Sequence, residues 1–178
     1  MEREQPFGTI VPPDWMVDEL DAGETAVAAF SVVKRVDESG TSAWSVRIAG
    51  DEVSDEERYG AIAAVVHGLR LELQSDWSGG PPAGDDVADE DGVEVDDGLD
   101  EPGYAAFADL FPVDWVAEPL PEGQDAVAIF AVIKTRDADG SLSWATRMAG
   151  AEVSSEELYG TLDPLAATLL DELAAGWG

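Results

Sequence analysis

Two pairs of adjacent glutamates, Glu56–Glu57 and Glu156–Glu157, most resemble a catalytic pair in this chain. Two carboxylates held close together can share the roles of general acid and general base. Each pair, however, follows a serine, Ser54 or Ser154, at the spacing of a capping box, in which the serine and the second glutamate satisfy N–H groups at a helix start. Acidic residues in a first turn also interact favourably with the helix dipole. We therefore favour a helix-capping role for both pairs.

The remaining catalytic candidates are sparse. His67 is the only histidine, and the position one hundred residues later is Ala167. No serine nucleophile sequence accompanies this histidine, and the chain has neither a P-loop nor a glycine-rich dinucleotide pattern. Glu52 and Glu152, just ahead of the expected helices, leave an acidic cluster as the alternative. We expect a protein that is not an enzyme and uses no cofactor.

A metal site is not expected either. The chain has no cysteine, which excludes disulfides, thiolate metal sites and cysteine nucleophiles. Asp89, Asp91 and Gly92 match part of an EF-hand loop, but Val87 stands where an earlier acidic ligand is needed. A solvated acidic spacer explains this segment better than a calcium site does.

The basic residues form a candidate interaction surface. There are nine of them against 39 acidic residues, and six recur on or near two expected strands of each half: Lys34, Arg35, Arg47, Lys134, Arg136 and Arg147. Side chains alternate along a strand, so Trp44 shares a face with Val46 and Ile48, whereas Arg47 points to the opposite face. We expect Trp44 to belong to the core. The cations either bind a partner or pair with the abundant acids.

These residues recur because the chain contains two copies of one module. Thr25–Val36 aligns without a gap on Asp125–Arg136, and the likeness continues to Gly60 and Gly160. Apolar residues then recur at the spacing of a helix with one buried face. Both glycines fall inside the expected helices and indicate a close backbone approach to the sheet or to the other module. Pro164 predicts a kink or break in the second helix, because proline removes a hydrogen bond and crowds the preceding turn.

We predict an α+β fold of tandem β-β-β-α modules. They span residues 1–77 and 104–178, and an acidic, Gly/Pro-rich linker joins them at 78–103. Each module is an antiparallel meander followed by one helix. In the first copy the expected strands are 15–20, 25–36 and 41–49.

The modules are expected to pack as an intramolecular pseudo-dimer about an approximate two-fold axis. A domain of about seventy residues buries only about 60% of its unfolded surface, and one helix covers only one face of a meander. Independent folding of the two modules is the alternative. Large aromatic residues at the ends of the apolar segments are candidates to fill the seam: Trp15, Trp77, Trp115 and Trp177.

The charge limits the possible partners. Ten of the 39 acidic residues lie at 85–101, which leaves 29 acids against nine bases, or about −20, outside that stretch. Such a field repels nucleic acid and attracts basic proteins. Solubility or adaptation to high salt, mimicry of nucleic acid and docking on a basic partner remain alternative explanations. No apolar stretch approaches the roughly 20 residues of a membrane helix, and no signal peptide is evident, so we expect neither membrane insertion nor secretion.

The string at 32–40, followed by Trp44, Arg47, Gly50 and the string at 54–60, resembles small acidic proteins of unknown function encoded by phages of actinobacteria. The resemblance covers both modules but not the linker. It implies a viral accessory or virion-associated protein without naming an activity.

We therefore expect a non-enzymatic protein-interaction module, cytoplasmic or virion-associated. Its expected partners are phage structural proteins or a basic host protein, with no direct contact to nucleic acid. An acidic nucleic-acid mimic that inhibits a basic host or defence protein is the alternative. An enzyme that uses carboxylates is a third and weaker hypothesis.

Overall fold

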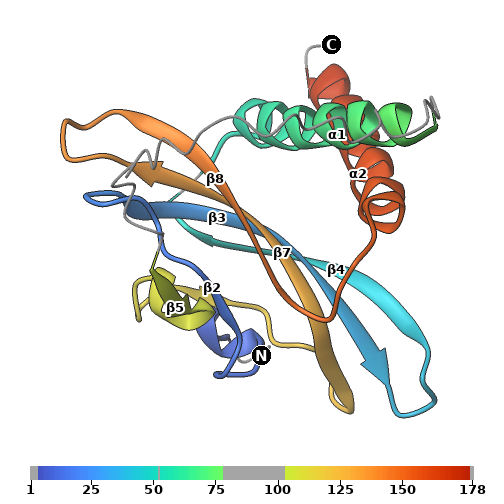
Figure 1. The fold of residues 1–178 in the computed structure, drawn as a ribbon, viewed down its shortest axis with the longest axis horizontal. Helices are drawn as coiled ribbons and strands as arrows, with labels where there is room; N and C mark the ends of the chain where they lie inside the picture. Colours follow the sequence, from blue (N-terminus) through green and yellow to red (C-terminus); the bar gives the residue numbers. More distant parts are fainter. Residues whose placement is uncertain (1–3, 52, 78–102, 177–178) are drawn as a thin grey trace, which may run out of the picture.

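The protein is seen in a computed structural model that describes residues 4–51, 53–77 and 103–176, with backbone alone at 76–77. Three layers are visible in Figure 1. A twisted four-stranded sheet lies in the middle, two helices cover one of its faces, and short strands with two 3-10 helices lie on the other side. The expected α+β class is confirmed.

The two halves have the same order of elements. The first half contains β1 (Gln5–Pro6), η1 (Phe7–Ile10), β2 (Met16–Asp18), β3 (Thr25–Asp37), β4 (Ser42–Gly50) and α1 (Asp55–Trp77). The second half contains β5 (Tyr104–Ala106), η2 (Phe107–Leu110), β6 (Val116–Ala117), β7 (Gln124–Arg136), β8 (Leu142–Gly150) and α2 (Ser155–Gly176). The long strands and both helices lie where the sequence predicted them.

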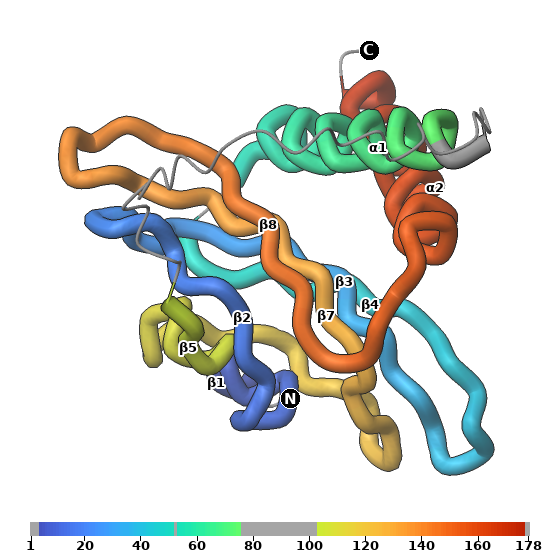
Figure 2. The backbone as a smooth tube through the Cα atoms, in the orientation of Figure 1, coloured from blue at the N-terminus to red at the C-terminus, as the bar shows by residue number. Residues whose placement is uncertain are grey.

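Both halves contribute to one central sheet, in the order β4-β3-β7-β8. All its neighbouring strands are antiparallel, and β3 pairs with β7 across the middle. Ser31 lies opposite Ala131, its equivalent in the second half, and the register then runs outward evenly to Val32–Phe130 and Phe30–Val132. The smooth backbone trace in Figure 2 shows these long strands crossing at the centre of the molecule.

The predicted three-stranded meander is wrong in its first strand. β2 has three residues and pairs with β5 of the other half instead of β3, and β1 pairs with β6. The physical reason is that the helices cover only one face of the sheet. The other face carries fully buried side chains such as Val33 and Ile133, which need a cover of their own. The short strands and 3-10 helices provide it, with Phe7 and Phe107 fully buried beneath them.

Side-chain alternation along the central strands produces two separate cores. Phe30 and Val32 of β3 face the helices and pack with Ile62 and Leu162. Val33, the next residue, faces the short-strand layer. Since both faces of β3 and β7 are covered, each strand contains six consecutive buried residues, the pattern of a central strand.

Three expectations for the helices have a clear outcome. α1 is continuous, as predicted, but α2 also runs unbroken through Pro164, so the predicted break is wrong. The carbonyl that loses its partner to Pro164 belongs to Gly160, which is exposed, so water can replace the lost bond. The expected close approach at Gly60 and Gly160 is also wrong, because an added Cβ would meet no atom within 4 Å at either position.

Candidate functional site

The two lysines of the expected cation set lie on the helix-facing side of the sheet and pair with acids of the opposite half. Lys34 Nζ lies 2.6 Å from Glu157 Oε1, and Lys134 Nζ lies 2.5 Å from Glu57 Oε1. The hydrogen bond from Lys134, and then one from the Ser54 backbone, lower the pKa of Glu57. Each lysine therefore ties a sheet strand to the first turn of the other half's helix.

The first helix also has the predicted capping box. The Glu57 N–H donates to Ser54 Oγ, and the Ser54 N–H donates to Glu57 Oε2, both at 3.2 Å. In the second helix the Glu157 N–H donates to Ser154 Oγ at 3.2 Å. Because both second glutamates also carry an ion pair, their positions are explained by capping and by contacts between the halves.

Arg47 and Arg147 lie on the opposite face of the sheet and bind backbone carbonyls of the other half. Arg47 donates from Nε and Nη2 to the carbonyls of residues 118–119, at 2.6 and 2.9 Å. Arg147 donates to the equivalent carbonyls of residues 18–19. Burial lowers the pKa of the Arg47 guanidinium. These two arginines hold the chain that follows β6 and β2 against the sheet.

The last two members of the set differ from each other. Arg35 Nη1 donates to Gln124 Oε1, whereas Arg136 is exposed at the end of β7. The six cations are thus divided between the two faces of the sheet and do not form one continuous patch. Among the described residues, the side chain of every lysine and arginine except Arg136 makes a hydrogen bond or ion pair within the chain.

Two of the four predicted seam tryptophans lie where the halves meet. The Trp115 indole lies against Gly50, and the Trp15 indole lies against Gly150. A Cβ added to Gly50 would be 2.6 Å from Trp115 Cζ2, so only glycine leaves room for the ring. Both glycines have a positive φ, +90° and +91°. The Trp77 side chain and Trp177 lie outside the described residues.

The other sequence candidates remain isolated. His67 is exposed on α1, and Glu152 is exposed just before α2. Glu52 and the partial EF-hand pattern at 87–92 lie outside the described residues. In the part of the chain that the structure describes, no group of three or more acidic or histidine side chains is arranged to hold a metal ion.

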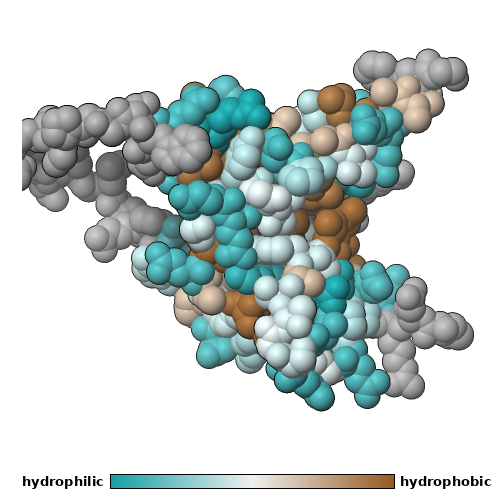
Figure 3. Space-filling view, turned by 90° about the vertical axis from the view of Figure 1, so that its right-hand side faces the viewer, coloured by the Kyte–Doolittle hydropathy of each residue, from teal (hydrophilic) through white to brown (hydrophobic). Residues whose placement is uncertain are grey.

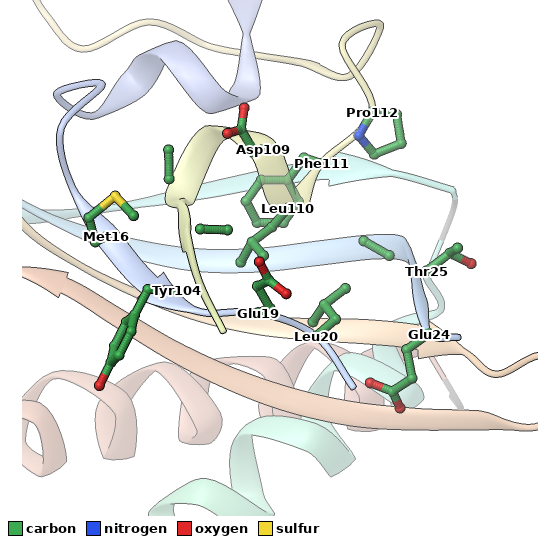
Figure 4. Close-up of a pocket in the computed structure, with 13 residues that line it drawn as sticks. Met16, Glu19, Leu20, Glu24, Thr25, Tyr104, Asp109, Leu110, Phe111 and Pro112 are labelled. Carbon is green, nitrogen blue, oxygen red and sulfur yellow. The ribbon is translucent and has the colours of Figure 1, made fainter. Parts of the chain in front are cut away.

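An open cleft of about 790 Å³, which no sequence pattern predicted, lies between the short-strand layer and the start of β3. Figure 4 shows its lining, with Glu24 and Tyr104 toward opposite ends and Glu19 near Leu20 and Leu110. The lining residues are Met16, Glu19, Leu20, Glu24, Thr25, Ala26, Tyr104, Ala105, Ala106, Asp109, Leu110, Phe111 and Pro112. The cleft is therefore built by both halves, from β2, β5, η2 and the segments that follow them.

The cleft combines an apolar lining with carboxylates. Glu19, Glu24 and Asp109 are its charged lining residues, and all three are acidic. Glu24 is half-buried, and its Oε1 accepts hydrogen bonds from Thr135 Oγ1 at 3.0 Å and Ser143 Oγ at 2.9 Å. Hydroxyl donors orient a carboxylate but do not neutralise its charge.

A smaller cleft of about 560 Å³ is lined by residues at the matching positions, 5–12 and 120–126, and is also built by both halves. Leu120, Gln124 and Asp125 line it where Leu20, Glu24 and Thr25 line the first cleft. The two clefts thus have lining residues at matching positions, but the residues themselves differ. Hereafter we call them the first and second cleft.

Exposed apolar side chains also gather on the outer strands of the sheet. They are Val46 and Ile48 on β4, with Leu142, Trp144 and Met148 on β8. Figure 3 shows one face of the molecule on which apolar side chains cluster beside a largely hydrophilic surface. These outer side chains stay exposed because the helices pack mainly over β3 and β7.

Comparison of the chain with known protein families, characterised proteins and solved structures finds no match. The resemblance to acidic actinobacterial phage proteins therefore stays a prediction. None of the described helices is long and apolar enough to cross a membrane.

Proposed function

We propose that this chain is a non-enzymatic protein-interaction module whose anionic surface binds a basic protein. Two duplicated modules, paired as an intramolecular pseudo-dimer, form the scaffold. The support for this pairing is the register of β3 on β7, which centres on Ser31–Ala131 and has matching irregularities on both sides, together with lysine and arginine contacts that cross between the halves.

The observation that carries the proposal is the distribution of charge. The net charge is −30, and seven of the eight described basic residues are engaged inside the chain. Few positive groups are left to neutralise a surface rich in exposed acids. Such a surface attracts basic proteins from a distance and repels phosphate backbones. Direct binding of nucleic acid is therefore disfavoured.

The setting that we propose is an actinobacterial phage, either in its particle or in the infected cytoplasm. The partner is then a basic phage structural protein or a basic host protein. The alternative is a nucleic-acid mimic that occupies the DNA site of a basic host or defence protein, and the same charge favours it. A carboxylate enzyme gains no support from the glutamate pairs, because the second member of each, Glu57 or Glu157, takes part in a helix cap and pairs with a lysine.

The proposal is tested by capture on the tagged full-length chain from an actinobacterial lysate and from purified phage particles. Between about 50 and 300 mM salt, recovery of a basic protein should fall steeply, because exposed charges are screened within about 10 Å at moderate salt. Recovery that does not change with salt contradicts binding through surface charge.

A DNA competitor separates the two alternatives. If the chain mimics nucleic acid, double-stranded DNA displaces it from the captured protein. If it is an interaction module that binds elsewhere, the complex survives DNA at the same salt concentration. Presence of the chain in purified particles supports the virion setting, and its absence there supports a cytoplasmic one.

A further inference from the structure

We propose that the first cleft receives an arginine side chain of the basic partner. This inference rests on the proposed function and deepens it, because it assigns one site and one recognised group to an otherwise diffuse anionic surface. Four observations support it: the shape of the cleft, its charge, its difference from the second cleft and the anchoring of its walls.

The size and lining of the first cleft suit a long side chain with an aliphatic stem. Its volume of about 790 Å³ lies within the roughly 300–1,000 Å³ typical of ligand sites. Leu20, Leu110 and Phe111 supply apolar surface along it. Met16 and Tyr104 are 53% and 72% exposed, so large apolar groups remain available for a ligand to cover.

The charge of the cleft favours a positively charged ligand. Among the described residues that line it, the three charged ones are carboxylates, and none is a lysine, arginine or histidine. Arg147 lies close by, but it donates to the carbonyls of Asp18 and Glu19. An incoming guanidinium would pair with carboxylates, of which Glu24 is half-buried, and charge-assisted hydrogen bonds of this kind are stronger than neutral ones.

The second cleft differs from the first at the position that matches Glu24. There the position of Glu24 is taken by Gln124, whose Oε1 accepts a hydrogen bond from the chain's own Arg35. In the first cleft the position of Arg35 is taken by the small residue Thr135. Gln124, which lines the second cleft, is thus bonded to an internal guanidinium, whereas Glu24, which lines the first, is a carboxylate bonded to hydroxyls. An arginine of the partner would supply to Glu24 the guanidinium that Arg35 supplies to Gln124.

The walls of the first cleft are held in place before any ligand arrives. Arg147 fixes the backbone of residues 18–19, and the hydroxyls of Thr135 and Ser143 orient Glu24. Preorganised carboxylates lose less conformational entropy when they bind, which favours affinity at a site of this size.

The test uses the full chain and a short synthetic peptide in which arginines alternate with leucines. An otherwise identical peptide with citrulline in place of arginine keeps the shape and removes the charge. Glu24→Gln places the second cleft's residue in the first and keeps the Oε1 acceptor for Thr135 and Ser143. We expect the arginine peptide to bind the natural chain, and Glu24→Gln to weaken it about tenfold or more. The citrulline peptide should not bind measurably.

The matched control is Glu122→Gln, which makes the same change of charge in the second cleft. It should leave peptide affinity within about twofold of the natural chain, since one exposed charge among many contributes little. Equal weakening by both variants, or equal binding of the citrulline peptide, overturns the arginine site. The salt-sensitive capture of a basic protein is a separate measurement. It can therefore support the proposed function even when the peptide experiment rules out the arginine site.

Discussion

At the scale of single residues, Gly50 and Gly150 show how the halves constrain each other. Each combines a positive φ with an indole of the other half at the position where a Cβ would stand. Gly40 has a similar φ of +82° but no atom within 4 Å of an added Cβ. A Cβ at Gly50 would also lie 2.7 Å from the Val27 carbonyl oxygen, so the contrast with Gly40 separates the cost of the backbone conformation from the cost of steric overlap.

We expect Gly50→Ala to destabilise the protein far more than Gly40→Ala. Both changes carry the roughly 1–2 kcal/mol cost of a left-handed conformation, and Gly50→Ala adds about 1–3 kcal/mol because the Trp115 ring and the Val27 carbonyl must move. Urea denaturation of the two variants measures the difference. Equal losses would mean that the ring and the carbonyl both make room freely.

Residue patterns explain why only part of the site was predictable. Strand alternation correctly separates Trp44, which packs toward the helices, from Arg47 on the opposite face. The pairing of Lys34 with Glu157 could not be predicted, because it depends on how β3 and β7 come together. The first cleft could not be predicted for the same reason. Glu24 and Asp109 are far apart in sequence and line one cleft only because the two halves fold together.

At the scale of elements, the two helices contain glycines with no structural need for them. Gly60 and Gly160 lie on exposed helix faces, and an added Cβ would touch nothing within 4 Å. Glycine inside a helix costs about 1 kcal/mol relative to alanine. Gly60→Ala and Gly160→Ala should therefore each raise the free energy of unfolding by up to about 1 kcal/mol. A loss of stability in urea denaturation would reveal a constraint on these backbones.

The elements also show where sequence rules succeed and fail. The long strands and helices are predictable because each has a strong internal pattern and its own cap or turn. Residues 5–18 are not, because two- and three-residue strands have no internal period and exist only through partners in the other half. The helix break predicted at Pro164 is wrong because a single exposed carbonyl can bond to water without ending a helix.

At the scale of the whole molecule, neither half contains a complete core. β3 lacks its central neighbour without β7, and the first cleft lacks one wall without β5 and η2. Isolated 1–77 and 104–178 should therefore be unfolded or self-associated, and mixing them should restore the folded complex. Light scattering with circular dichroism measures both properties. A folded monomer of either fragment would contradict the proposed pairing.

Net charge gives a second prediction for the whole molecule. A charge of −30 on 178 residues destabilises the compact state by self-repulsion, and salt screens that repulsion. We expect the thermal midpoint to rise between about 10 and 300 mM sodium chloride. Scanning calorimetry at fixed pH measures the change. A midpoint that falls would show that the internal ion pairs, such as Lys34–Glu157, outweigh the repulsion.

The central pairing of β3 with β7 has one further consequence. In an assembly of two identical chains, every substitution appears at both symmetry-related positions, so a change that improves one site must be tolerated at the other. In this protein the two equivalent positions lie on one chain, so either can be substituted without the other. Glu24 accepts from Thr135, while its equivalent Gln124 accepts from Arg35. The covalent link thus allows matching positions to carry different groups: a carboxylate held by hydroxyls in the first cleft and an amide bonded to the chain's own guanidinium in the second.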